Sequence, residues 1–322
     1  MKAIVHDRYG APDVLELREI DQPQVGDDEV LVRVHAASVN PADWYAMAGV
    51  PWIARPPTGL GRPKTGRVGL DLAGVVAAVG GAVTRFQPGD EVFGVGTGTL
   101  AESVAVPEQA LVGKPANLSF EQAAAVPVAA LTALQGLRDK GRIQPGQQVL
   151  VNGASGGVGT FAVQLAKASG AEVTGVCSTR NLDMVASLGA DRVVDYTRED
   201  FTRTDRRYDL LLDVAGSRSW SACRRVLTPR AIHVLVGAPK GNRLLGPLGH
   251  ILKVQLASLR ASQKVRFFIS KADHQDLAVL QELLEAGTVT PVVERSYPLR
   301  QTADALRYLG EGHARGKLVI TL

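Results

Sequence analysis

The chain of 322 residues contains only two cysteines, Cys177 and Cys223, and neither belongs to a recognisable spacing motif. This shortage argues against a disulfide framework and fits a reducing compartment, so we expect a cytoplasmic protein. The sequence also has no run of more than two consecutive lysines or arginines, and its formal net charge is only +4. We therefore expect neither nucleic acid nor a membrane as a partner, although a mild positive charge suits a phosphate-bearing ligand.

Long hydrophobic runs are missing as well. The longest apolar stretch, residues 123–134, is interrupted by Pro127 and is shorter than the about 20 residues that cross a bilayer. The chain begins directly with a strand-like pattern at residues 1–5, and no signal-peptide pattern stands before it. Hydrophobic residues still make up 45% of the chain, which is enough for the cores of roughly two domains of about 150 residues each.

The first 120 residues favour β-structure. Runs rich in β-branched residues at 3–5, 14–20 and 30–39 are separated by glycine, proline and aspartate, which is typical of short strands joined by turns. Residues 50–66 differ because they hold four prolines and several glycines. We predict a long surface loop without regular structure there, of the kind that often carries function.

From Ser119 onward, strand-like and helical patterns alternate. Short runs of Val, Leu and Ile at 149–151, 172–176, 192–194, 210–214 and 231–236 are followed by helical or loop segments. This alternation predicts an α/β fold with a doubly wound parallel sheet. We expect this nucleotide-binding domain, residues 121–270, to be inserted into a discontinuous β-rich domain formed by residues 1–120 and 271–322.

The stretch at residues 149–165 combines a short strand, a glycine-rich turn and a helical segment. Gly156 and Gly159 fill the second and third positions of the dinucleotide-binding pattern G-x-G-x-x-G, and Ala154 replaces the first glycine. The second glycine lets the backbone approach a pyrophosphate, and the third lets helix and strand pack closely. We therefore predict a dinucleotide site formed by Ala154, Ser155, Gly156, Gly157, Val158 and Gly159.

The same turn also matches G-x-S-x-G, the nucleophile elbow of an α/β-hydrolase, with Ser155 as the nucleophile. Downstream histidines are available as the base, namely His233, His250, His274 and His313. That elbow normally follows several βα units, whereas about 120 residues of β-type chain come first here, and an elbow has no use for Gly159. The dinucleotide site is therefore favoured over the hydrolase, and a tight turn that binds nothing is the other alternative.

The end of the next strand determines which dinucleotide is expected. A site for NAD places Asp or Glu about 20 residues after the glycines, where it holds the ribose 2′-hydroxyl. Residues 177–181 read Cys-Ser-Thr-Arg-Asn and contain no carboxylate. Ser178 can donate a hydrogen bond and Arg180 can make a charge-assisted contact with a 2′-phosphate. We therefore predict NADPH as the cofactor, with a solvated Arg180 as the alternative interpretation.

Several motifs occur in order along nearly the whole chain. They are Ala-Ala-Ser-Val-Asn-Pro-Ala-Asp at 36–43, Gly-Leu-Asp-Leu-Ala-Gly-Val-Val at 69–76, Phe-Gln-Pro-Gly-Asp-Glu-Val-Phe-Gly at 86–94, Ala-Ala-Val-Pro at 124–127, Leu-Gly-Ala-Asp at 188–191 and Gly-Lys-Leu-Val at 316–319. In these motifs the chain resembles the zinc-independent medium-chain dehydrogenases/reductases of the quinone oxidoreductase (zeta-crystallin-like) branch. The resemblance implies a GroES-like catalytic domain beside a Rossmann domain.

The resemblance also implies roles for individual residues. Asn40 and Tyr45 would face the nicotinamide and the substrate, with Tyr45 either donating a proton or hydrogen bond to the developing oxyanion or only packing. Further cofactor contacts would come from Thr132, Tyr196, Gly237, Phe267, Phe268 and Lys317. Asp43 and Asp71 would be either catalytic acids or, more in keeping with turn chemistry, solvated or capping residues.

Zinc relatives in this family hold their catalytic metal with Cys and His-Glu residues. Here Asn40 stands about where the first cysteine would be, Leu70-Asp71 replaces the His-Glu pair, and no cysteine precedes Cys177. Without a Lewis acid, hydride transfer is expected to a conjugated acceptor, a quinone or an α,β-unsaturated carbonyl. An enoyl thioester or carbonyl reductase and a non-catalytic NADPH-binding protein are the alternatives.

Two segments remain. We expect residues 50–66 to shape or cover the acceptor pocket, with Trp52 as an apolar or stacking wall. Residues 265–269, from Val265 to Ile269, form an apolar run that would lie at the edge of the sheet in this topology. Since an exposed edge strand usually has a partner, and family members pair this strand across a two-fold axis, we predict a homodimer.

Overall fold

The computed structural model describes residues 1–238, 244 and 246–322. It divides into two units, one formed by residues 1–131 and 271–322 and the other by residues 132–270. Residues 121–131, expected from the sequence in the nucleotide-binding domain, lie in the first unit. None of the described helices has the length and apolar character needed to cross a membrane.

The first unit is built on a seven-stranded sheet. Its strand order is β14 (Val293–Pro298), β15 (Lys317–Thr321), β3 (Glu29–Val39), β4 (Asp71–Val79), β5 (Glu91–Val95) and β7 (Leu111–Gly113), with β6 (Ser103–Pro107) paired to β3. A second sheet joins β1 (Lys2–Val5) to β2 (Glu16–Glu19). The helices of this unit include α1 (Pro41–Ala48), α3 (Phe120–Ala124), α9 (His274–Glu285) and α10 (Thr302–Glu311).

Strand β3 shows why this sheet forms. Val30, Val32 and Val34 alternate along the strand and are buried in one hydrophobic cluster, which also contains Leu72 of β4 and Ile320 of β15. Because successive side chains of a strand point to opposite faces, these three valines lie on one face and pack into the same core. The core of the first unit therefore depends on a strand from the far end of the chain.

The register of these strands brings distant residues together. β15 runs antiparallel to β3 with Leu318 opposite Val39, and β4 runs antiparallel to β3 with Asp71 opposite Ser38. Lys317 precedes Leu318 and Asn40 follows Val39, so both lie at the same end of the pairing. The ends of β3, β4 and β15 therefore bring the side chains of Asn40, Asp71 and Lys317 close together.

Residues 50–66 are not wholly irregular, so the prediction of a loop without regular structure is wrong for its first half. A 3₁₀ turn at Trp52–Ala54 leads into the short helix α2 (Arg55–Thr58). Pro56 lies in the first turn of α2, where the missing backbone N–H has no intrahelical acceptor to lose. A high proline content therefore did not exclude a helix here.

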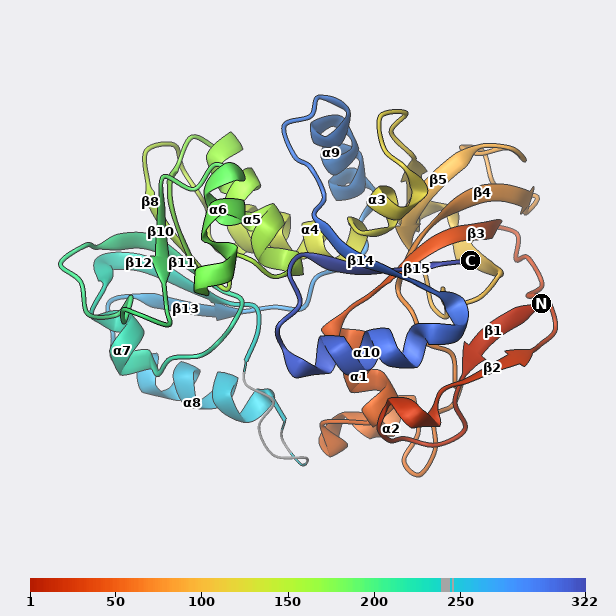
Figure 1. Ribbon diagram of the computed structural model, residues 1–322, viewed down its shortest axis with the longest axis horizontal. Coiled ribbons are helices and arrows are strands. Elements are labelled where there is room, and N and C mark those ends of the chain that lie inside the picture. The colour runs from red at the N-terminus through yellow and green to blue at the C-terminus, as the bar shows by residue number, and fades with distance from the viewer. Residues whose placement is uncertain (239–243, 245) are drawn as a thin grey trace. The chain divides into compact units, whose positions relative to one another are not determined.

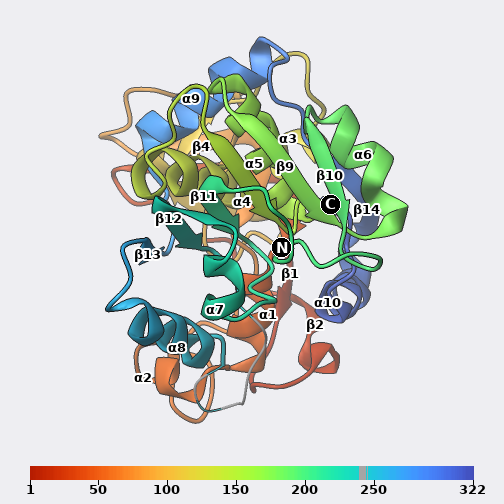
Figure 2. The ribbon, with the colours of Figure 1, turned by 90° about the vertical axis from the view of Figure 1, so that its left-hand side faces the viewer.

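The described residues of the second unit form a parallel six-stranded sheet with helices on its faces. The order is β10 (Arg192–Asp195), β9 (Glu172–Cys177), β8 (Gln148–Asn152), β11 (Tyr208–Asp213), β12 (Leu227–Leu235) and β13 (Lys264–Phe267), and Figure 2 shows the strands fanned in this sequence. Helices α5 (Gly157–Ala168) and α6 (Leu182–Ser187) lie on one side, and α7 (Trp220–Arg224) and α8 (Leu248–Ser258) on the other (Figure 1). The strand order reverses between β8 and β11, which confirms the predicted doubly wound Rossmann sheet.

The edge strand of this unit differs in extent from its prediction. The strand expected at 265–269 is β13, which ends at Phe267 and occupies an edge of the sheet as predicted.

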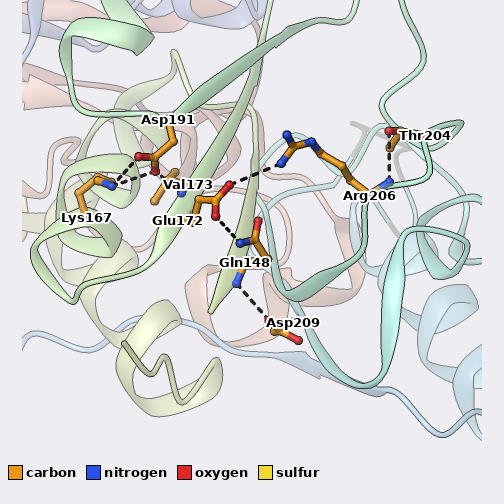
Figure 3. A network of polar contacts seen from close by, with 8 residues as sticks. All are labelled: Gln148, Lys167, Glu172, Val173, Asp191, Thr204, Arg206 and Asp209. Atoms are coloured by element: carbon orange, nitrogen blue, oxygen red, sulfur yellow. Dashed lines mark hydrogen bonds and ion pairs between the residues drawn. The ribbon is translucent and has the colours of Figure 1, made fainter. Parts of the chain in front are cut away.

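A polar network joins the amino ends of the central strands (Figure 3). The Lys167 ammonium of α5 lies 2.8 Å from both oxygens of Asp191, and the Val173 amide of β9 donates to the same carboxylate. Gln148 of β8 links Glu172 to Asp209. Because these contacts occupy the amino edge, the opposite carboxyl edge, which carries the glycine turn, is where a ligand site is expected.

Candidate functional site

The glycine turn begins immediately after β8. Gly153 adopts a φ of +89°, a conformation that glycine reaches without strain. The amides of Gly153 and Ala154 both donate to the Val176 carbonyl of β9, at 3.1 and 3.0 Å. The turn is therefore tied to the neighbouring strand, and helix α5 starts at Gly157 with Gly156 as its N-cap.

Gly156 and Gly159 lack side chains for different reasons. A Cβ at Gly159 would come within 2.1 Å of the Gly153 carbonyl oxygen, so helix and turn can pack only around a glycine. A Cβ at Gly156 would meet nothing nearer than 3.6 Å. The protein itself leaves the space at Gly156 open, which fits a backbone surface that a ligand approaches closely.

The amino end of α5 suits an anion. The helix has twelve residues and no acidic side chain in its first turn. Its first amides carry no intrahelical partner and its macrodipole is positive at this end. The turn residues therefore fit the pyrophosphate of a dinucleotide, as the sequence predicts.

Ser155 does not form a hydrolase site. Its Oγ accepts a hydrogen bond of 3.1 Å from Nδ2 of Asn181. Among the described residues, no histidine is hydrogen-bonded to it. Asn181 Nδ2 also donates to Ser178 Oγ at 3.2 Å, so the end of β9 is joined to the glycine turn.

The other residues expected near the adenosine half lie at the carboxyl ends of β9 and β10. Arg180 is exposed on the short 3₁₀ turn Thr179–Asn181, and Tyr196 is half-exposed directly after β10. A carboxylate that the sequence did not suggest, Asp195, lies nearby, because it pairs with Cys177 in the parallel ladder. The hydrogen bond that Thr179 Oγ1 donates to Asp195 Oδ2 is the main cause that lowers the pKa of Asp195, and Thr197 donates to Oδ1. Both oxygens of this carboxylate therefore accept hydrogen bonds from the protein itself.

Four further predicted cofactor contacts belong to the same unit. Thr132 Oγ1 donates to Ser270 Oγ at 2.9 Å. Gly237 follows β12, and a Cβ there would meet the Val214 carbonyl oxygen at 1.9 Å. Phe267 packs against the hydrophobic core of the unit, and the Phe268 ring lies 6.0 Å from the Lys140 ammonium.

In the first unit, Asn40, Asp71 and Lys317 form a buried polar cluster. The Lys317 ammonium donates to Asn40 Oδ1 at 2.6 Å and to Asp71 Oδ2 at 3.0 Å. Asn40 Nδ2 and Ser38 Oγ both donate to the same Asp71 oxygen, and the Val128 amide donates to the other. Lys317 is only 3% exposed, so its ammonium is directed at protein groups of this unit.

Asp43 and Asp71 are buried rather than solvated. Asp43 Oδ2 accepts a hydrogen bond of 2.7 Å from the backbone N–H of Asn40 and so caps the start of α1. Burial is the main cause that raises the pKa of Asp43 to about 7, and the charge of Asp71 adds to the effect. The spacing Asn40 to Asp43 matches an N-cap followed by an acid at the third helical position, a sequence signal that identifies this role.

Tyr45 and Trp52 present the more accessible groups of this unit. Burial raises the pKa of the half-buried Tyr45 phenol, and its hydroxyl has no hydrogen-bond partner among the described residues. Trp52 is 48% exposed, and the Arg55 guanidinium lies over its ring and that of Tyr9. Tyr45 is thus available as a protonated donor.

One group of possible metal ligands occurs in the described residues of the second unit. Asp213, Cys223 and His233 are all buried, with donor atoms within 4.8 Å of one another. Asp213 Oδ1 accepts hydrogen bonds from Asn152 and Gly216, and Oδ2 lies 3.2 Å from His233 Nε2. These hydrogen bonds hold the turn after β11.

Comparisons with known proteins match both units. Residues 26–116 match the family model of the alcohol dehydrogenase GroES-like domain, and residues 188–320 match that of the zinc-binding dehydrogenases. The mitochondrial NAD(P)H oxidoreductase RTN4IP1 of Mus musculus is 34% identical, covering 100% of this chain and 89% of the relative. The chloroplastic NADPH-dependent alkenal/one oxidoreductase of Arabidopsis thaliana is 33% identical, covering 99% of this chain and 79% of the relative.

Among solved structures, the quinone oxidoreductase from Coxiella burnetii is similar over the whole chain. It superimposes with a TM-score of 0.87 at 30% identity, covering 100% of this chain and 99% of that one. The GroES-like and Rossmann folds predicted from the sequence are therefore confirmed. The chain belongs to the medium-chain dehydrogenase/reductase family, in the group of the quinone oxidoreductases, and is an oxidoreductase.

Proposed function

We propose that this protein uses NADPH to reduce a quinone or an α,β-unsaturated carbonyl without a metal ion. The observation that carries the proposal is the turn at Gly156, which the protein leaves open in front of an acid-free helix start. The names of relatives that act on quinones or on alkenals and alkenones support the acceptor class. Bound NADPH would supply the hydride, and the protein would supply position and charge.

The preference for NADPH over NADH is supported by the groups after β9. Ser178 and Arg180 can contact a 2′-phosphate, as a hydroxyl donor and a cation. Asp195, the carboxylate that lies beside Cys177 in the parallel ladder, is held by Thr179 and Thr197. It is therefore not presented to a ribose hydroxyl as an NAD-selective acid would be.

The residues of the first unit do not fit the zinc that is named by the family model matching residues 188–320. The cluster at Asn40 and Asp71 offers an amide and a carboxylate, and the Lys317 ammonium already occupies both. Both cysteines of the chain lie outside this unit. Since a zinc site requires several Cys, His or carboxylate ligands, this cluster does not provide one.

Within the first unit, we propose Tyr45 as the group that donates to the acceptor oxygen. A tyrosine phenol is protonated at neutral pH, and burial raises the pKa of Tyr45 further, so its hydroxyl can stabilise negative charge that develops on a carbonyl oxygen. Asn40 is the buried N-cap of α1, the helix that carries Tyr45, and Lys317 donates to Asn40 Oδ1. In this proposal, Lys317 holds Asn40 in place, and Asn40 fixes the start of α1 and so the position of Tyr45.

A reduction assay tests this function. The purified protein is given NADPH with a simple quinone, an alkenone, an enoyl thioester or an aldehyde, and NADPH oxidation is followed. We expect turnover with the quinone or alkenone, and a kcat lower by about 100-fold in Tyr45→Phe. Turnover only with the thioester or the aldehyde would contradict the proposed acceptor and identify an enoyl thioester or carbonyl reductase. Tight NADPH binding without turnover on any acceptor would show that the protein is not a catalyst of these reactions.

We further propose that residues 50–66 form part of the acceptor pocket, with Trp52 as one of its walls. Trp52 and Ile53 are both 48% exposed, which leaves apolar surface that an acceptor can cover. Trp52→Ala should lower kcat/KM for a bulky quinone more than for a small alkenone. If the ratio of kcat/KM for the bulky quinone to kcat/KM for the small alkenone is the same in Trp52→Ala and in the wild type, Trp52 does not line the acceptor pocket.

We also propose a homodimer formed through the edge strand β13. Leu252, Leu256 and Leu259 are more than half exposed on or next to α8, and Ile269 follows β13 at 78% exposure. Such a set of apolar side chains beside an open edge is typical of an interface. Light scattering should give a dimer at micromolar concentration and a monomer for Leu256→Glu, while a monomeric wild type would contradict the proposal.

The proposed compartment is the cytoplasm. Both cysteines are free and buried, as expected where thiols stay reduced. Fractionation of the producing cell would test this placement, and recovery with another compartment would refute it.

A further inference from the structure

Asn181 connects the two loops that surround the proposed adenosine site. Its side chain is 4% exposed, and Nδ2 donates to Ser155 Oγ at 3.1 Å and to Ser178 Oγ at 3.2 Å. Ser155 belongs to the glycine turn and Ser178 follows β9. One amide group therefore holds hydroxyls from two separate segments near each other.

The orientation of this amide follows from the hydrogen-bond count. As placed, both hydrogens of Nδ2 have acceptors, and only Oδ1 is buried without a partner. The reversed amide would leave two buried N–H donors unpartnered instead of one acceptor. Because unpartnered buried donors cost free energy, the orientation with Nδ2 toward the serines is favoured.

This orientation fixes what the serine hydroxyls can do. Each Oγ accepts a hydrogen bond from Asn181 Nδ2, so the hydroxyl hydrogens of Ser155 and Ser178 are directed elsewhere. Neither hydroxyl donates to an acceptor among the described residues, and both side chains are only half-buried. The pair is therefore set to donate to an incoming group, and an anion offers the strongest acceptors.

We propose that Asn181 is a specificity-determining positioning residue that presets Ser155 and Ser178 as paired donors to the 2′-phosphate of the cofactor. This rests on the proposed preference for NADPH. A ribose 2′-hydroxyl, as in NADH, carries no charge and gains less from two hydroxyl donors. Asn181 thus favours the phosphorylated cofactor without touching it.

The central test is Asn181→Asp, which keeps the shape of the side chain. A carboxylate only accepts hydrogen bonds, so it would turn both serine hydroxyls inward and add a negative charge. Calorimetry with adenosine 2′,5′-bisphosphate and with 5′-AMP reports the effect apart from activity. We expect the Kd of the bisphosphate to rise about 10-fold or more and that of 5′-AMP less than about 2-fold.

Controls separate positioning from charge and from loss of structure. Asn117→Asp makes the same chemical change at an exposed asparagine of the other unit, whose Nδ2 donates to the Leu284 carbonyl, and should leave both Kd values unchanged. Asn181→Ala adds no charge and should still raise the bisphosphate Kd about 3-fold. When Ser178→Ala is already present, Asn181→Asp should raise the Kd of the bisphosphate by a smaller factor than in the wild type, because one of the two serine hydroxyls is absent.

The outcomes distinguish this inference from the proposed function. If the wild type binds the bisphosphate no better than 5′-AMP, the preference for NADPH is wrong. If the wild type prefers the bisphosphate and Asn181→Asp retains that preference, the positioning role is wrong while NADPH stands. Equal weakening of both ligands together with a lower Tm would show a purely structural role and also overturn the inference.

Discussion

The Lys317 ammonium lies 2.6 Å from Oδ1 of Asn40, although 277 positions separate the two residues. The same ammonium is paired with Asp71 at 3.0 Å, and all three side chains are buried. Removing one partner of a buried ion pair leaves the other charge without compensation. The cluster therefore ties the last strand of the first unit to the start of α1.

We expect Lys317→Met to lower the free energy of unfolding by about 3–5 kcal/mol, since it leaves the Asp71 carboxylate buried and unpaired. Urea unfolding measures this loss. The double variant Lys317→Met/Asp71→Asn should recover part of it. The exposed Lys64→Met is the matched control and should change stability by no more than about 0.5 kcal/mol. If Lys317→Met is as stable as Lys64→Met, the ion pair between Lys317 and Asp71 does not stabilise the protein.

The two glycines of the turn should separate binding from stability. Gly159→Ala should lower stability by about 1–3 kcal/mol, because its Cβ would collide with the Gly153 carbonyl oxygen. Gly156→Ala should fold almost normally but raise the Kd of NADPH about 10-fold, because its Cβ stands where the pyrophosphate approaches. Thermal unfolding and fluorescence titration measure the two effects. Unchanged NADPH binding by Gly156→Ala would remove the turn from the cofactor site.

Arg180→Ala should weaken NADPH by about 1–3 kcal/mol through the loss of a charge-assisted contact, and should leave NADH nearly unaffected. Parallel measurement of the two Kd values tests this. Arg203→Ala serves as control, since Arg203 is a highly exposed arginine of the same unit. Equal weakening of both cofactors would show that Arg180 does not recognise the 2′-phosphate.

Asp43 should make stability depend on pH. Its pKa rises from a usual 3.8 to about 7 in the folded protein, so between these values the folded state binds the proton that the unfolded state has released. Stability should therefore fall as the pH rises from about 4 through about 7, by at most about 1.4 kcal/mol for each pH unit. Urea unfolding across this range should show the slope in the wild type and a smaller one in Asp43→Asn. The exposed Asp27→Asn should keep the wild-type slope, and an unchanged slope in Asp43→Asn would refute the assignment.

Local patterns predicted the parts of this protein that depend on nearby residues. The turn from Gly153 to Gly159 has a strand before it and a helix after it, and each is visible in a short window of sequence. The burial of Lys317 has no such local signal, because it arises from the register of β15, β3 and β4. Asn181 likewise acquires its contacts only when two loops meet. Helix α2 was missed because prolines suggest a break, although the first helical turn accepts them.

The position of β15 has a consequence for the order of events during synthesis. This strand lies between β14 and β3 in the sheet, and its residues 317–321 are made after nearly everything they pair with. All strands of the second unit have left the ribosome by then, so that unit can fold first. Until then the Ala36–Val39 part of β3 has no partner on the edge that β15 covers, because β6 pairs only with Glu29–Arg33 there, and chaperones that shield open strands should act on nascent chains in this interval.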